Sequence, residues 1–147
     1  MPVLTILAAL LVAPKSIMVT HRSCYLNALG EAIHAKLDHN SRYLWILPLF
    51  HCNGWGFSWA VTAVCGMHVF LENLDKNEII TIILTEKITH FCAVPTLLKK
   101  IHKSVNFSQL QNSNLIRIFT AGSSPGIEVL KAYDTIGVEV IQVYGLT

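Results

Sequence analysis

The chain has 147 residues, of which 52% are hydrophobic and only 14% are charged, and its formal net charge is +2. A typical soluble domain carries about 25% charged residues, so this composition favours a core-rich piece of a larger domain over a free-standing one. The weak net charge, the scattered basic residues and the four widely spaced cysteines argue against a nucleic-acid-binding surface and against a structural zinc site.

The N-terminal segment Met1–Ala13 is apolar apart from Thr5. As a helix it would extend about 20 Å, which is short of a bilayer core of about 30 Å. It has the length of a signal-peptide core, but no basic residue precedes it and no clear cleavage site follows it. We therefore expect a cytoplasmic protein with reduced thiols and no transmembrane segment; a peroxisomal or other organellar location stays open for the parent protein.

From Pro14 onward, short β-rich runs alternate with longer helical patterns. In chain order, the first half predicts a strand over Ser16–Thr20, a helix over Cys24–Leu37, a turn over Asp38–Ser41, a strand over Tyr43–Leu47, a helix over Gly54–Gly66 and a strand over Met67–Leu71. The second half predicts a helix from Asp75 to Lys87, a strand over Thr89–Val94, a helix over Thr96–Ser104, a strand over Leu115–Thr120, a loop over Gly122–Gly126, a helix over Ile127–Ile136 and a strand over Glu139–Val143.

Local signals set several of these bounds. Thr20 or Ser23 can cap the first helix and Asp75 the third, while Pro48 and Pro95 end strands. The first helix carries apolar residues on one face, namely Leu26, Leu29, Ile33 and Leu37.

This order of elements predicts an α/β fold with a doubly wound, mostly parallel sheet, because strands separated by helices of this length are joined by right-handed crossovers. Ligands on such sheets bind beyond the carboxyl ends of the strands. We find no internal repeat and no linker that would indicate a second domain.

The first strand end with potentially reactive side chains is the run Leu47–Gly56. It places His51 and Cys52 directly after a strand that we expect to be buried. A histidine in this position is also compatible with a purely structural role. Adjacent residues on an extended segment point to opposite sides, so His51 and Cys52 do not form a nucleophile pair.

Two further strand ends carry polar or small residues. Leu115–Thr120 leads into Gly122, Ser123 and Ser124 before a helix, where free backbone N–H groups favour an anionic or nucleotide ligand. The last strand leads into Tyr144 and Thr147, which offer a flat ring for a base and a hydroxyl for a phosphate. Taken singly, each of these segments is equally an ordinary turn.

In this order and spacing, the three segments resemble the adenylate-forming superfamily, which includes acyl-CoA synthetases, luciferases and peptide-synthetase adenylation domains. Pro14-Lys15-Ser16 is similar to the end of its phosphate-loop motif, Leu47–His51 to its substrate-tunnel motif and Gly145-Leu146-Thr147 to the start of its Tyr-Gly-x-Thr-Glu motif. The runs 51–55 and 89–96 resemble the branch that activates fatty or other aliphatic acids.

The resemblance implies that residues 14–147 form a partial AMP-binding domain, preceded by an unmatched apolar segment, 1–13. It implies a carboxylic acid, ATP and CoA as substrates and Mg²⁺ as cofactor. The first step joins the acid to the α-phosphate of ATP, and CoA then displaces AMP. Catalytic roles fall to His51, which faces the acyl group, and to Thr147; nucleotide-binding roles fall to Gly122, Ser123, Ser124, Gln142, Tyr144, Gly145 and Thr147. No metal ligand is assigned.

The sequence also departs from the family pattern. The place of the Ser/Thr/Gly-rich phosphate loop is taken by Leu4–Ala13, with no glycine and one hydroxyl, and backbone amides in so bulky a run cannot wrap a triphosphate. Ser16 stands where glycine is usual, and Ser123-Ser124 replaces the commoner alanines. The sequence stops before the glutamate that would help to hold Mg²⁺.

Three interpretations remain open. The chain is an inactive fragment of an acyl-CoA ligase, a pseudoenzyme fragment that pairs with an intact ligase through an open sheet edge, or part of an active ligase whose other residues lie outside this sequence.

The missing phosphate loop generates the first prediction. We expect no acid-dependent ATP–pyrophosphate exchange from the 147-residue chain with any fatty acid, and weak binding of AMP at most. Exchange above the acid-free background would contradict this expectation.

Overall fold

The computed structural model describes residues 2–7, 15–49, 56–71, 75–111, 113 and 116–144; for 2–7 and 15–17 only the backbone is described. The chain divides into two compact units, one made of residues 1–40, 47–67 and 147 and the other of 41–46 and 68–146. Each unit is described by itself below.

The first unit contains a two-stranded antiparallel sheet. Strand β1 (Pro2–Leu7) pairs with β2 (Lys15–Thr20), with Pro2 opposite Thr20 and Leu7 opposite Lys15. The predicted strand at 16–20 is confirmed, although it joins this hairpin and not the parallel sheet. The strand at 2–7 was not predicted, because a short apolar run does not by itself distinguish a strand from a helix.

Helix α1 (His21–Ala35) begins earlier than predicted because two hydroxyls act together at its start. The Thr20 hydroxyl accepts from the Ser23 N–H at 3.1 Å, and the Ser23 hydroxyl accepts from the Thr20 N–H at 3.0 Å. This reciprocal pair is a capping box, which satisfies two backbone donors at the helix start.

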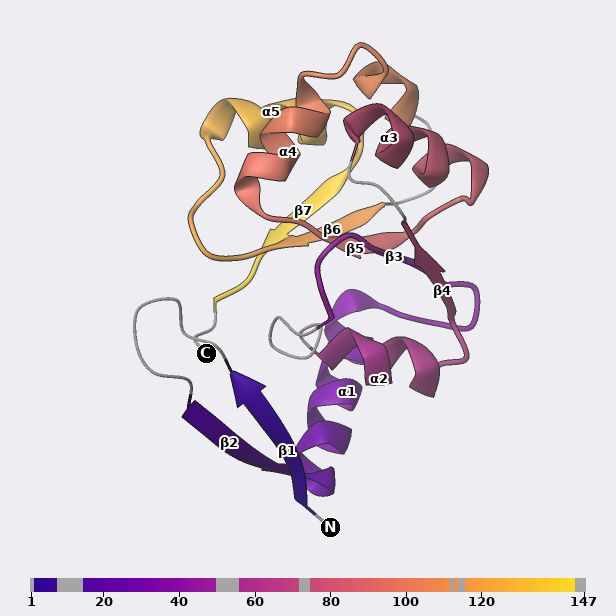
Figure 1. Ribbon diagram of the computed structural model, residues 1–147. Helices are drawn as coiled ribbons and strands as arrows, with labels where there is room; N and C mark the ends of the chain where they lie inside the picture. The colour runs from indigo at the N-terminus through magenta and orange to yellow at the C-terminus, as the bar shows by residue number, and fades with distance from the viewer. Residues whose placement is uncertain are drawn as a thin grey trace. The chain divides into compact units, whose positions relative to one another are not determined.

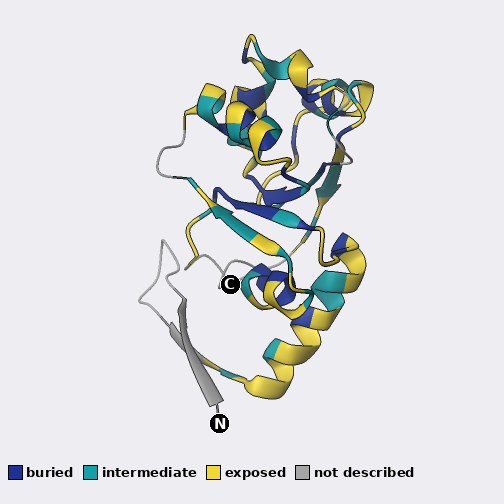
Figure 2. Cartoon of the chain, turned by 90° about the vertical axis from the view of Figure 1, so that its right-hand side faces the viewer, coloured by how far each residue is buried: buried dark blue, intermediate teal, exposed yellow. Residues whose placement is uncertain are grey.

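Of the four apolar residues predicted for one face of the first helix, three are exposed, and the fourth, Leu37, lies beyond the helix end and is buried. Leu26 is 54% exposed, Leu29 39% and Ile33 74%, whereas the helix buries the small residues Ala28 and Ala35 (Figure 2). Helix α1 contacts α2 (Phe57–Ala63), which buries Phe57, Ala60 and Val61 along one face. The three exposed residues share a face by their spacing, and within α1 the buried residues are alanines on another part of the helix surface.

The second unit is built on a five-stranded sheet with the order β4-β3-β5-β6-β7. Its strands are β3 (Arg42–Trp45), β4 (Met67–Phe70), β5 (His90–Cys92), β6 (Arg117–Thr120) and β7 (Glu139–Gln142). The pairs β3–β5, β5–β6 and β6–β7 are parallel. The chain adds β4 on one side of β3 and then β5, β6 and β7 on the other, so the predicted α/β fold with a doubly wound sheet is confirmed.

Figure 1 shows the three helices of this unit on one face of the sheet: α3 (Lys76–Thr85), α4 (Pro95–His102) and α5 (Ile127–Thr135). The Asp75 carboxylate caps α3 as predicted, accepting from the N–H groups of Asn77 at 2.8 Å and Glu78 at 3.3 Å. Pro95 opens α4 as its first residue, where its missing N–H costs nothing. A 3₁₀ turn, η2 (Phe107–Leu110), was not predicted.

Alternate strand residues face these helices and form the core. Leu44, Phe91 and Ile118 all belong to one buried cluster with residues of α3, α4 and α5. The Tyr133 hydroxyl of α5 donates to the Leu98 carbonyl of α4 at 3.1 Å, which ties two helices together, and burial raises the pKa of Tyr133.

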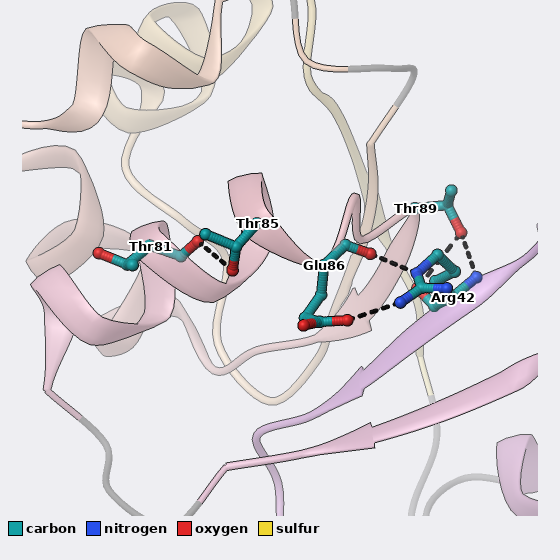
Figure 3. Close-up of polar contacts among 5 residues, drawn as sticks. All are labelled: Arg42, Thr81, Thr85, Glu86 and Thr89. Atoms are coloured by element: carbon teal, nitrogen blue, oxygen red, sulfur yellow. Dashed lines mark hydrogen bonds and ion pairs between the residues drawn. The ribbon is translucent and has the colours of Figure 1, made fainter.

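The amino edge of the sheet is held by charged side chains. The Arg42 guanidinium donates to the Glu86 carboxylate at 2.6 Å and to the Glu86 carbonyl at the end of α3 (Figure 3). The Thr89 hydroxyl accepts from the Arg42 N–H at 2.9 Å, and Arg117 pairs with Glu139 at 2.7 Å. These contacts join the beginnings of the strands in two pairs, β3 with β5 and β6 with β7.

Gly56 provides a test of the α1–α2 contact. Its φ is +83°, and an added Cβ would lie 2.0 Å from Nδ2 of Asn27 on α1. Left-handed backbone costs an L-residue about 1–2 kcal/mol, so we expect Gly56→Ala to lower the unfolding free energy by at least that amount in urea titrations.

Gly30→Ala is the matched control. Gly30 lies inside α1 with nothing within 4 Å of the added Cβ, so alanine should stabilise the chain by up to about 1 kcal/mol. Equal effects of the two substitutions would contradict the packing described here.

Candidate functional site

The carboxyl ends of β6 and β7 form the best-defined candidate site in the second unit. Thr120 and Gln142 are register partners at the ends of these parallel strands, and the Val143 N–H donates to the Thr120 carbonyl at 2.8 Å. Loop 121–126 therefore leaves the sheet beside the segment 143–144. Two stretches separated by an entire helix meet at one edge.

A side-chain hydrogen bond joins the two stretches. The Ser124 hydroxyl donates to Oε1 of Gln142 at 3.3 Å, and the Pro125 carbonyl lies 3.4 Å from the same hydroxyl as a second acceptor. Gly122 has a φ of +95° and open space around the position of a Cβ, while Gly122, Ser123 and Ser124 are all exposed. The loop thus presents backbone and hydroxyl groups to solvent, anchored at the buried Pro125.

Tyr144 follows two residues after Gln142 and is 91% exposed. Its ring is available for stacking. The structure accordingly brings five of the predicted nucleotide-binding residues to one edge of the sheet: Gly122, Ser123, Ser124, Gln142 and Tyr144. The predicted His51, Gly145 and Thr147 lie outside the described residues, and the roles of all eight remain predictions.

Helix α5 begins directly after the loop, as the sequence indicates. Its N-cap, Gly126, makes no side-chain cap hydrogen bond, and Glu128 lies in the first turn. The Glu128 carboxylate already complements the positive end of the helix dipole, so the helix start alone does not define an anion site.

Thr120 is the residue of this site that the sequence prediction did not single out. It is completely buried, and within the described residues its hydroxyl has no hydrogen-bond partner. The available signal was a hydroxyl at the last position of a buried strand, directly before a loop of small residues. Its burial is a tertiary property, which a local sequence pattern does not reveal.

An aromatic cluster lies on the opposite face of the sheet at β3 and β4. Trp45 stacks on His68 and Phe70 with ring centroids 5.9 and 6.1 Å away, and Trp45 Nε1–H donates to His68 Nδ1 at 2.9 Å. On the same face, the Tyr43 hydroxyl donates to Sγ of Cys92 at 3.0 Å. The strand order reverses between β3 and β5, so the Tyr43–Cys92 contact joins the two strands that flank the switch point of the sheet.

Within the described ranges, no three His, Cys, Asp or Glu side chains gather closely enough to hold a metal ion. None of the helices that the structure describes has the length and apolarity to cross a bilayer. The described part of the site therefore offers nucleotide-type contacts, namely hydroxyls, backbone groups and an aromatic ring.

Fold and strand-end loops define a doubly wound α/β domain with a candidate ligand site at the carboxyl edge of its sheet. A family model described as AMP-binding enzyme matches residues 13–147. The chain therefore belongs to the AMP-binding enzyme family.

Two curated relatives are CoA ligases. 4-Hydroxybutyrate–CoA ligase 2 of Metallosphaera sedula is 40% identical over 134 residues, which cover 91% of this chain and 24% of that ligase. Acetate–CoA ligase CCL3 of Humulus lupulus is 33% identical over 136 residues, which cover 92% of this chain and 24% of the ligase. The chain thus spans about a quarter of the length of these relatives.

Solved structures show the same fold. The inhibitor-bound N-terminal domain of FACL13 from Mycobacterium tuberculosis superposes with a TM-score of 0.88 at 22% identity, over 97% of this chain and 36% of that one. O-succinylbenzoate CoA synthetase (MenE) from Bacillus subtilis, in complex with AMP, gives a TM-score of 0.81 at 23% identity, over 97% and 36%.

The Trp45–His68 hydrogen bond generates a prediction about pH. His68 Nδ1 accepts the indole proton, so the imidazole is neutral in the folded chain, and burial lowers the pKa of His68. The unfolded chain therefore binds more protons below about pH 6.5, and stability falls as the pH decreases through that value.

We expect the melting temperature of the wild-type chain to fall between pH 7.5 and 5.5, and His68→Gln to reduce that fall. His39→Gln, in the exposed turn after α1, controls for the loss of a histidine as such. An unchanged pH profile in His68→Gln would show that this hydrogen bond does not couple folding to protonation.

Proposed function

We propose that this chain carries the adenylate-binding part of a carboxylic acid–CoA ligase, with a fatty or other aliphatic acid as substrate. Membership of the AMP-binding family and the names of the CoA-ligase relatives support the reaction class. The observation that carries the proposal is the pairing of Thr120 with Gln142, which places loop 122–124 beside Tyr144 at one edge of the sheet.

The proposed reaction has two steps that a carboxylate requires because it is a poor electrophile. The carboxylate oxygen attacks the α-phosphorus of ATP and pyrophosphate leaves, which gives an acyl-adenylate. The CoA sulfur then attacks the acyl carbon, the bond to AMP breaks, and the thioester forms. Each step needs fixed donors where negative charge develops.

In this proposal, each described site residue has a role that follows from its side chain or its backbone. Tyr144 stacks on adenine, and the open loop at Gly122, Ser123 and Ser124 lines the adenine and the acyl group. Gln142 lies against the nucleotide and holds the loop through Ser124. For the residues outside the described ranges, His51 faces the acyl group, Gly145 approaches the nucleotide and Thr147 contacts the α-phosphate.

Magnesium would neutralise phosphate charge in such a ligase. Among the residues that the structure describes, no three ligating side chains lie together. CoA is the thiol substrate of the second step in this proposal.

Adenine stacking tests the proposal. We expect weak AMP binding by the 147-residue chain, seen as saturation transfer to the adenine protons in ligand-observed NMR. Stacking on an aromatic side chain is worth about 1–3 kcal/mol per base, so Tyr144→Ala should weaken binding at least about fivefold.

Tyr25→Ala is the matched control, because Tyr25 is also an exposed tyrosine, on α1 in the other unit. The proposal requires that Tyr25→Ala binds AMP like the wild type. If the chain is instead a non-catalytic module that pairs with an intact ligase, no transfer to adenine is expected from any of the three proteins.

A further inference from the structure

The Thr120 hydroxyl is an exception among the polar side chains of the sheet. Thr120 is 0% exposed, and Oγ1 has no hydrogen-bond partner in the part of the chain that the structure describes. By contrast, Thr89 at the other edge accepts from the Arg42 N–H at 2.9 Å and donates to the Arg42 carbonyl at 3.3 Å. Burying an unpaired hydroxyl costs free energy, so its presence calls for an explanation.

The strand register identifies a polar neighbour of Thr120 on the adjacent strand. Thr120 and Gln142 are paired residues of neighbouring parallel strands, so their side chains leave the same face of the sheet. This is the face of Ile118 and Val140, which pack in the core beneath the helices. Gln142 is exposed at the strand end, whereas Thr120 is buried, so the register gives a buried hydroxyl a neighbour on the same face whose amide reaches solvent.

The hydrogen bond that Gln142 makes with Ser124 is a weak one. Its Oε1 accepts from Ser124 at 3.3 Å, which is long for an O–H···O hydrogen bond. The Ser124 hydroxyl has a single proton to donate. If the Ser124 hydroxyl donates its proton to a ligand instead, Oε1 of Gln142 loses its hydrogen-bond donor.

We propose that Thr120 is a positioning residue for the nucleotide site: its hydroxyl bonds the Gln142 side-chain amide when Ser124 turns from Gln142 to the nucleotide. A hydroxyl both donates and accepts, so it can bond either end of the amide. Thr120 is buried and acts through Gln142 without touching the ligand. This inference rests on the proposed function of the loop at Gly122, Ser123 and Ser124.

The first test measures stability without any nucleotide. Thr120→Val replaces an unpaired hydroxyl by a methyl group of similar size, so we expect the melting temperature to rise by about 2–8 °C. Thr89→Val is the matched control and should lower it, because that hydroxyl has partners. A lower melting temperature for Thr120→Val would show that the hydroxyl is already satisfied, for example by a buried water, and would overturn the proposal.

The second test measures binding of AMP to the same proteins. Loss of one neutral hydrogen bond corresponds to about a two- to tenfold weaker affinity, which we expect for Thr120→Val. Thr120→Ser keeps the hydroxyl and should bind like the wild type. In a Gln142→Ala background, Thr120→Val should cause no further loss, whereas a merely structural effect would add to that of Gln142→Ala.

The outcomes separate this inference from the proposed function. If the wild type, Thr120→Val and Thr120→Ser bind AMP equally, the nucleotide site stands and the role of Thr120 is overturned. If the wild type itself does not bind AMP, the nucleotide site fails and this inference fails with it. Additive losses from Thr120→Val and Gln142→Ala also overturn the positioning role.

Discussion

The organisation of the second unit depends on the parallel pairing of its strands. Parallel strands end at the same edge, so every loop that follows one opens on the same side of the sheet. The β6–β7 register puts Thr120 beside Gln142, and a hydrogen bond then joins Ser124 to Gln142 across 18 positions of sequence. Without that ladder, the small-residue loop and the exposed tyrosine would be unrelated surface features.

The two edges of this sheet have different chemistry. At the amino edge, ion pairs join Arg42 to Glu86 and Arg117 to Glu139, and the Thr89 hydroxyl bonds the backbone of the neighbouring strand. These groups are partly exposed, so each ion pair adds little free energy, although together they define how the strands begin. The carboxyl edge instead carries small, exposed residues with few mutual contacts. A ligand site needs groups with free hydrogen-bonding capacity, because donors and acceptors that already bond one another are not available to a ligand.

Helix α1 illustrates the limit of periodicity as a guide to burial. The spacing of Leu26, Leu29 and Ile33 correctly places them on one face of a helix, yet all three are exposed and the helix packs through alanines. Periodicity reports which side chains share a face. It does not report which face meets a neighbour, since that depends on the rest of the protein.

The sequence by itself determined what is encoded within a few residues. The capping residues Thr20 and Asp75, the prolines at strand ends and the alternation of patterns predicted every strand of the parallel sheet to within a few residues, because these signals act through local backbone hydrogen bonds and sterics. Family resemblance then selected the residues of the candidate site, and the rule for parallel strands predicted that those after β6 and β7 would meet.

The tertiary structure alone decided features that depend on partners far along the chain. The apolar run at 2–7 is a strand because it pairs with β2, and the Trp45–His68 bond joins residues 23 positions apart. Among the described residues, the hydroxyl of Thr120 is buried and unpaired, which no local pattern indicates. Such burial is a property of packed surfaces, and a linear pattern contains no record of which surfaces come together.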